Sequence, residues 1–227
     1  MSILVHDDCE TGLCRIDINR PQSANALDVA TLLALNDALA LAGGDTAVSA
    51  IVIGACGGKH FCAGADMREP RSPQRAADFR QGLGDLLSML FAIEKPVVAA
   101  IDGAASGAGA MVACAVDRVF IADSAFLCFP ELDAAVPPLL AFDLLAQSVG
   151  VSLARELVLT GRRIYPEECV SLGLVAEQHP PLKVRASAEQ AALDLAAKPG
   201  DAFVRFKRHL AGRAVPIVRA AIAELSA

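Results

Sequence analysis

Residues 102–117 read DGAASGAGAMVACAVD, a stretch that carries almost only small side chains where an apolar, helical segment begins. A turn of glycine and alanine between a strand and a helix lets a ligand approach the main chain closely. The first N–H groups of a helix have no intrahelical partner, and the helix dipole favours negative charge there. The stretch therefore predicts either an anion-binding helix start at 105–110 or tight packing of the helix on a strand. It does not fit the dinucleotide-binding pattern G-x-G-x-x-G, because Val112 takes the third glycine position.

A second stretch of small residues, at 60–67, reads HFCAGADM. It also follows an apolar, branched run (48–56) that predicts a buried strand, and its centre is reduced to Ala63, Gly64 and Ala65. Two such loops, each after a core strand, can aim two N–H groups at one point. Two convergent donors are what an oxyanion hole requires to stabilise a carbonyl oxygen that becomes an enolate.

The chain around these loops alternates between strand and helix patterns. A hairpin is predicted around Glu10–Gly12, closed by Pro21. The other predicted elements are strands at 48–56, from Pro96, at 118–123 and at 125–129, a loop at 57–73, and helices at 28–44 with an Asp28 cap, 74–93, 139–149, 151–160, 166–172, 184–198 and 201–226 with interruptions. Strands that alternate with helices and are followed by a run of helices predict an α/β fold with a helical C-terminal portion.

The composition provides enough apolar residues for a large core. Of 227 residues, 54% are hydrophobic and 20% are charged, which predicts one large domain or one domain with a helical appendage. The net charge of −6 argues against nucleic acid as a partner. The seven Cys and four His are scattered without a C-x-x-C pair, so buried thiols in a reducing compartment are favoured over a metal site or disulfides. The N-terminus turns acidic, unlike a signal peptide, and Asp residues interrupt the long apolar stretches, so a cytoplasmic protein without a membrane segment is predicted.

Four stretches together resemble the crotonase (enoyl-CoA hydratase/isomerase) superfamily: HFCAGADM, KPVVAAIDGAASGAGA, CAVDRVFIADSAFLCFPEL and ELVLTGRRIYPEECVSLGLV. The resemblance runs from about Ile3 to Ala176, with the motifs in the family's order and spacing. It implies a spiral of ββα units over 1–180, with the C-terminal helices of 181–227 in the same domain and serving oligomerisation or pocket cover. It also implies an acyl-CoA substrate, no cofactor apart from coenzyme A as part of that substrate, and a homotrimer or homohexamer.

The resemblance assigns catalytic roles to three residues. Ala65 and Ala108 supply the two backbone N–H groups that stabilise the enolate, and Glu131 in FPEL supplies a carboxylate. Hydratases of the family carry two glutamates, and Met111 stands at the position of the other one. Met cannot accept a proton, whereas one carboxylate is enough for Δ3,Δ2-enoyl-CoA isomerisation, in which it removes a proton from C2 and returns it at C4. The apolar segment FLCFPEL is expected to raise the pKa of Glu131 towards a useful range.

The resemblance also implies residues that contact the substrate. Those in the two loops and the helix start are Ala63, Gly64, Asp66, Gly107, Gly109 and Met111. Three basic residues lie on or near loops expected to face the coenzyme A phosphates: Arg20, Lys59 and Arg68. Lys207 or Arg208 could also reach from the C-terminal helices. Taken alone, each basic residue is better explained as a solvated surface charge. A cap or brace of its loop is favoured for Asp66 over contact with substrate, and core packing or lining of the acyl pocket is favoured for Met111.

Two other kinds of function are compatible with the pattern. One is an enoyl-CoA hydratase, or a dehydratase or decarboxylase that acts on a carrier-protein thioester. The other is a non-catalytic acyl-CoA-binding or scaffold protein, but the two intact loops and Glu131 speak against it. The single-glutamate isomerase is favoured over both.

Overall fold

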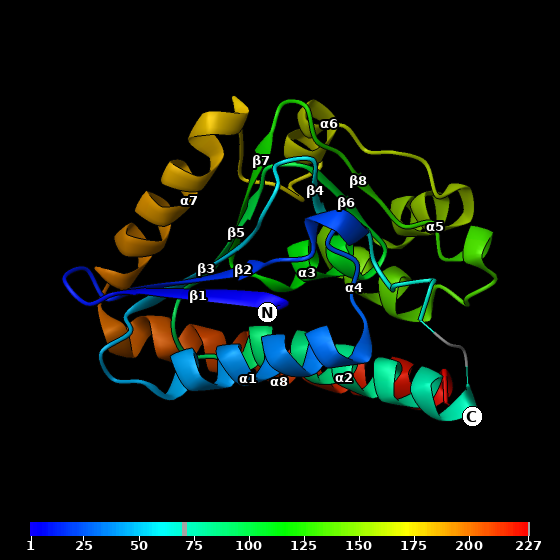
Figure 1. Ribbon diagram of the computed structural model, residues 1–227, viewed down its shortest axis with the longest axis horizontal. Helices are drawn as coiled ribbons and strands as arrows, with labels where there is room; N and C mark the ends of the chain where they lie inside the picture. Colours follow the sequence, from blue (N-terminus) through cyan, green and yellow to red (C-terminus); the bar gives the residue numbers. More distant parts are fainter. Residues whose placement is uncertain (70–71, 227) are drawn as a thin grey trace.

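The main sheet begins with the predicted N-terminal hairpin. β1 (Ile3–Asp8) pairs antiparallel with β2 (Leu13–Ile18) in the computed structural model, which describes residues 1–69 and 72–226 (Figure 1). Parallel strands extend the sheet in the order β1-β2-β3-β5-β7-β9, namely β3 (Ala50–Ala55), β5 (Val97–Ile101), β7 (Arg118–Ala122) and β9 (Glu177–His179). β3 and β5 are buried along their whole length, as expected of apolar runs in a parallel sheet that is covered on both faces.

A second sheet consists of three short parallel strands, one of which lies within the strand predicted at 125–129. Its order is β4-β6-β8, with β4 (His60–Cys62), β6 (Ala104–Ser106) and β8 (Leu127–Cys128). The loop prediction for 57–73 is therefore wrong over β4, and β6 occupies the first part of the small-residue stretch. β4 and β6, with three residues each, are too short to show an alternating pattern, so sequence periodicity cannot reveal them. Residues 70 and 71 of the predicted loop lie outside the described ranges.

The helices largely follow the predicted ranges. They are α1 (Val29–Gly44), α2 (Pro73–Ala92), α3 (Ala108–Ala115), α4 (Leu139–Val149), α5 (Val151–Thr160), α6 (Pro166–Ser171), α7 (Pro181–Ala196) and α8 (Gly200–Glu224), with short 3-10 helices at Pro21–Ser23 and Leu132–Ala134. Asp28 caps α1 as predicted, because its carboxylate accepts a hydrogen bond from the Thr31 N–H at 2.7 Å. α7 begins earlier than predicted, and α8 is continuous where interruptions were predicted, although it contains Pro216. The predicted fold class, α/β with a helical C-terminal portion, is confirmed.

The helices form groups around the main sheet. α7 packs against β3, β5 and β7. α2 packs against both α1 and α8, and Figure 1 shows these three helices along one side of the molecule, apart from α7. α4 packs against α5 and also contacts α8. Within residues 1–69 and 72–226, no helix is both long and apolar enough to cross a membrane.

A buried ion pair fastens α8 to the interior. Lys207 is 2% exposed, and its Nζ donates hydrogen bonds to Asp117 Oδ1 (2.8 Å) and to the Leu90 carbonyl in α2 (3.1 Å). The other carboxylate oxygen of Asp117 accepts a hydrogen bond from the Val97 N–H at 2.8 Å. Burial raises the pKa of the Asp117 carboxyl, and the neighbouring ammonium offsets part of that effect. This one lysine therefore links α8, α2 and the start of β5.

We expect Lys207→Met to destabilise the protein, because it leaves the Asp117 carboxylate buried without its counter-charge. Removing one partner of a buried ion pair typically lowers the free energy of unfolding by roughly 3–5 kcal/mol. The value here should fall at the low end of that range, since Asp117 can take up a proton. Urea unfolding measures the change, and the double variant Lys207→Met/Asp117→Asn should recover part of it. Equal stability of the wild type and Lys207→Met would contradict a structural role for the pair.

Candidate active site

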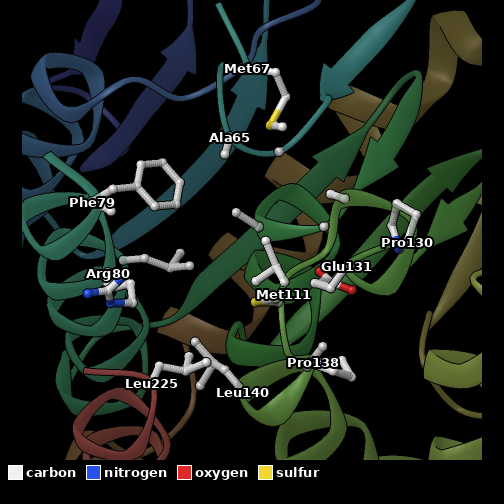
Figure 2. A pocket seen from close by; sticks show the side chains of 18 of the residues that line it. Ala65, Met67, Phe79, Arg80, Met111, Pro130, Glu131, Pro138, Leu140 and Leu225 are labelled. Carbon is white, nitrogen blue, oxygen red and sulfur yellow. The ribbon is translucent and has the colours of Figure 1, made fainter. Parts of the chain in front are cut away.

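A cavity of about 610 Å³ opens between the two small-residue loops and the helices α2, α4 and α8 (Figure 2). Its wall is mostly apolar and includes Phe79, Leu83, Met111, Leu140, Ile222 and Leu225. Both loops that the sequence singled out reach this wall, one through Ala63–Met67 and the other through Ser106–Ala108. An apolar cavity with a few convergent polar groups is the usual form of a small-molecule site.

The loop after β4 is held so that one peptide N–H stays free. The Leu27 N–H donates to the Gly64 carbonyl, and the Leu27 carbonyl accepts from the Asp66 N–H, both at 2.8 Å. These two bonds fix the peptides on either side of Ala65, whose own N–H has no acceptor among the described residues. Gly64 has φ = +87°, a conformation that residues with a side chain rarely adopt, so this turn requires glycine.

The second free N–H belongs to the first residue of α3. The Ala108 N–H has no intrahelical partner because of its position, and no other acceptor within the described part of the chain. The two loops touch, since a Cβ atom on Gly64 would lie 3.0 Å from the Ser106 carbonyl oxygen and 3.5 Å from the Ala108 nitrogen. Gly109 permits close packing of α3 on β4, because a Cβ atom there would lie 2.4 Å from the Cys62 carbonyl oxygen. The two free N–H groups therefore belong to backbone segments that meet without intervening side chains.

Glu131 lies beside this contact with an unpaired carboxyl group. It is 9% exposed, and neither side-chain oxygen has a hydrogen-bond partner within residues 1–69 and 72–226. A Cβ atom on Gly107 would lie 3.3 Å from Glu131 Oε1, so the carboxyl group adjoins the loop that leads into Ala108. Burial raises the pKa of this carboxyl from its usual 4.5 to about 7. A carboxyl group with such a pKa can accept and return a proton near neutral pH.

Two further carboxylates of the cavity wall are paired with arginines. Asp66 accepts hydrogen bonds from Arg68 and Arg20, and those from Arg68 are the main cause that lowers its pKa to about 2. Glu69 pairs with Arg75 at 2.5 Å. Asp66 thus braces its loop, which is one of the two roles considered for it from the sequence.

Met111 occupies the position at which the family resemblance places a second glutamate in hydratases. It lies in α3, is 5% exposed and shares the cavity wall with Glu131 (Figure 2). Its thioether carries no ionisable group. In the described part of the chain, no cluster of three or more His, Cys, Asp or Glu side chains could hold a metal ion. The arrangement offers two N–H donors and one base, which can stabilise an oxyanion and move a proton.

The cavity wall contains most of the residues predicted to form the site, namely Ala63, Gly64, Ala65, Asp66, Gly107, Ala108, Met111 and Glu131. The remaining ones lie outside this wall, namely Gly109, Arg20, Lys59 and Arg68. Gly109 faces β4 instead of the cavity. The structure therefore brings the loop residues and the glutamate together around the cavity, whereas the three basic residues do not line it.

The Arg20 guanidinium pairs with two carboxylates of the protein, and its predicted contact with a coenzyme A phosphate stays a prediction. It pairs with Asp28 at 2.8 Å and with Asp66 at 3.0 Å, so it holds the loop after β4 against the start of α1. Arg68 is more exposed and pairs with the same Asp66. Lys59 is exposed just before β4. Contacts of Lys59 and Arg68 with coenzyme A phosphates stay predictions.

The two basic residues proposed from the C-terminal helices do not line the cavity either. The expectation that Lys207 reaches a phosphate is wrong, because its ammonium is buried against Asp117. Arg208 is exposed, and its guanidinium binds both carboxylate oxygens of Glu94, at 2.5 and 3.1 Å. Both side chains fasten α8 to neighbouring elements.

Two residues that shape the site escaped the sequence analysis. Asn25 is 1% exposed, and its side-chain amide donates to the His60 carbonyl at 2.6 Å, which ties the turn before α1 to β4. Arg80 lines the cavity from α2. The sequence carried a signal for Arg80, because helical spacing puts it on one face with Ala76 and Leu83.

Comparisons with known proteins point to one family. The family model described as Enoyl-CoA hydratase/isomerase matches residues 8–223. The chain is 35% identical over 166 residues to the 2,3-dehydroadipyl-CoA hydratase of Escherichia coli (strain K12), covering 73% of the chain and 65% of that protein. It is 36% identical over 163 residues to the mitochondrial enoyl-CoA hydratase of Pongo abelii, covering 71% of the chain and 56% of that protein. The chain thus spans less than two thirds of these curated relatives. A crystal structure of an enoyl-CoA hydratase from Bacillus anthracis has a TM-score of 0.86 at 26% identity, covering 99% of this chain and 92% of that one.

Proposed function

The chain belongs to the enoyl-CoA hydratase/isomerase family, and on that premise we propose that it acts on acyl-CoA thioesters. The thioester oxygen accepts hydrogen bonds from the N–H groups of Ala65 and Ala108, which stabilise it as it becomes an enolate. Support comes from the close contact of their loops and from the lack of another acceptor for these two groups among the residues that the structure describes. One such donor typically contributes roughly 2.7–4 kcal/mol to lowering the barrier. Coenzyme A enters as part of the substrate.

We propose Δ3,Δ2-enoyl-CoA isomerisation as the reaction. The observation that carries this proposal is the Glu131 carboxyl group beside Gly107, which has no partner in the described part of the chain, with Met111 in the same wall. The Glu131 carboxylate removes a proton from C2 of a 3-enoyl thioester, and the electron pair spreads into a dienolate. The protonated Glu131 then gives the proton to C4, which yields the 2-enoyl thioester and restores the carboxylate.

Hydration of a 2-enoyl thioester is the second candidate, because the relatives described above are named hydratases. That reaction requires one group to orient the water and another to manage the proton at C2. Met111 can do neither, so Glu131 would have to do both. The isomerase is favoured for this reason, and a carrier-protein thioester or a non-catalytic role stays an alternative.

A side-by-side assay distinguishes these reactions. The same preparation is given 3-enoyl-CoA and 2-enoyl-CoA of several chain lengths, and both double-bond migration and water addition are followed. We expect isomerisation to dominate. Fast hydration without isomerisation would replace this proposal by the hydratase, and acyl-CoA binding without turnover of either substrate would favour the non-catalytic alternative.

We expect kcat/KM for isomerisation to rise with pH and to level off above about pH 7. Glu131 must be ionised to take the proton from C2, and burial raises its pKa to about 7. Below that pH, the protonated carboxyl cannot act as a base, so the rate should fall about tenfold per pH unit. A pH–rate profile measured with a non-titrating substrate checks this. A profile that stays flat through neutral pH would contradict Glu131 as the base.

The homotrimer or homohexamer and the cytoplasmic location stay predictions. Several large apolar side chains are exposed on the single chain, among them Val151, Leu159 and Leu182, which is compatible with self-association. Sedimentation at micromolar concentration tests the assembly, and a stable monomer would count against it.

A further inference from the structure

Arg80 stands on the α2 wall of the cavity, across from Glu131 in Figure 2. It shares a helix face with Leu83, so a charged side chain interrupts the apolar stripe of α2. Its surroundings in the wall include Phe79 from the same helix and Leu225 from the end of α8. A cation is thus placed among apolar side chains, on the side of the cavity away from the proposed base.

The Arg80 side chain has no acidic partner within the described residues. Its Nε is buried without a hydrogen-bond acceptor, and it forms no ion pair in the described part of the chain. The neighbouring charges of the wall are matched differently, since Arg75 pairs with Glu69 and Asp66 pairs with two other arginines. Among residues 1–69 and 72–226, no acidic side chain therefore pairs with the positive charge of Arg80.

A half-buried guanidinium in a cavity wall, with no acidic partner among the described residues, is a suitable binding group for an anion. Arginine stays charged at any physiological pH, and Arg80 is half-buried, with its Nε shielded from water and without an acceptor among the described residues. In such surroundings its attraction for an anion is stronger than in bulk water. The planar guanidinium also binds a carboxylate through two parallel hydrogen bonds.

We propose that Arg80 binds a terminal carboxylate on the acyl chain, so that the substrates are monothioesters of dicarboxylic acids. This inference rests on the proposed acyl-CoA function, which places the thioester at Ala65 and Ala108. The rest of the cavity wall is mostly apolar, with Met111 and Leu140 among its residues, and suits a methylene chain. Coenzyme A phosphates are another source of anions, but they are strongly hydrated and suit an exposed rim better than this wall.

The test measures binding of saturated thioesters, which need no turnover. Glutaryl-CoA and adipyl-CoA are compared by calorimetry with pentanoyl-CoA and hexanoyl-CoA, which have the same chain lengths without the carboxylate. We expect the wild type to bind the carboxylated thioesters roughly 10- to 100-fold more tightly. Arg80→Met, which keeps the apolar stem, should abolish this preference, and Arg80→Lys should keep part of it. Arg219→Met, on the exposed side of α8, serves as the control and should keep the full preference.

Each outcome bears on the inference. Equal binding of both thioester types by the wild type overturns it without any variant, and so does a preference that survives Arg80→Met. The same thioesters on pantetheine, which lacks the nucleotide phosphates, separate the two anion sources. If Arg80→Met weakens all CoA thioesters alike and leaves the pantetheine thioesters unchanged, Arg80 binds phosphate and the inference fails. Isomerase turnover of a neutral 3-enoyl-CoA without any preference would overturn this inference alone, whereas a preference without isomerase turnover would overturn the proposed reaction alone.

Discussion

Glu131→Gln should remove nearly all isomerase activity while acyl-CoA binding stays close to the wild-type value. Gln has almost the same size as Glu and preserves the packing beside Gly107, but it cannot take a proton from C2. Loss of a positioned general base typically lowers the rate roughly 10²- to 10⁴-fold. We expect the high end of that range, because the same carboxyl group serves both proton transfers. Steady-state kinetics give the rate loss, and calorimetry with a saturated thioester gives the affinity.

The same substitution should not weaken the fold, which separates a chemical effect from a structural one. Folding raises the pKa of Glu131 from 4.5 to about 7, so the folded state binds this proton more tightly than the unfolded state does. The contribution of Glu131 to the stability of the wild-type protein therefore falls as the pH rises from 4.5 to about 7. Gln carries no titrating proton, so at pH 8 the variant should unfold at the same temperature as the wild type or at a higher one.

Glu69→Gln is the matched control for the carboxylate. Glu69 also belongs to the cavity wall, but it pairs with Arg75 and accepts a hydrogen bond from the Val29 N–H. We expect a far smaller loss of activity than for Glu131→Gln. Full isomerase activity in Glu131→Gln, or equal losses in both variants, would show that the base is misassigned.

Gly64→Ala should lower kcat roughly 10²- to 10³-fold, the usual effect of losing one oxyanion-hole donor. Gly64 has φ = +87°, and a Cβ atom there would lie 3.0 Å from the Ser106 carbonyl oxygen and 3.5 Å from the Ala108 nitrogen. The added methyl group must push the two loops apart. The Ala65 N–H then no longer points where the thioester oxygen sits.

Gly173→Ala separates this local effect from general backbone strain. Gly173 has φ = +74°, a Cβ atom there would meet nothing within 4 Å, and the residue lies outside the cavity wall. Both variants should lose stability, because alanine in a left-handed conformation costs roughly 1–2 kcal/mol. Only Gly64→Ala should lose activity. Thermal unfolding and kcat for the two proteins decide the matter, and unchanged kcat in Gly64→Ala would rule out the loop contact as the catalytic feature.

The sequence predicted those features of the site that lie within short continuous segments of the chain. The runs of small residues at 63–65 and 107–109 could be recognised in the sequence. In the structure the two loops that carry them touch each other. The apolar neighbours of Glu131 were also visible, and burial does raise its pKa. Helices such as α1 were predictable because a cap residue and a regular apolar spacing lie within one continuous segment.

The features that the sequence analysis did not predict depend on contacts between residues that are far apart in the chain. β4 and β6 are too short for periodicity and exist through pairing with each other. Whether a basic side chain can bind a ligand depends on which acidic side chains the fold places beside it, and the sequence does not show this. Arg20 and Lys207 were expected to bind a phosphate, but in the structure both pair with aspartates. Arg80 is the reverse case, since an arginine in a helix is expected to be solvated and this one lines a cavity.

The position of α8 in the chain has a consequence for biosynthesis. Of the elements described, α8 leaves the ribosome last, yet Lys207 must reach the Leu90 carbonyl 117 residues earlier, and Ile222 must reach the cavity. Translation proceeds at roughly 5–20 residues per second, so on the order of 6–23 seconds pass between the synthesis of Leu90 in α2 and that of Lys207 in α8. During that interval the nascent chain displays the apolar wall of its own future cavity. We therefore expect ribosome-bound chains that lack α8 to be captured by chaperones and to show no ligand binding.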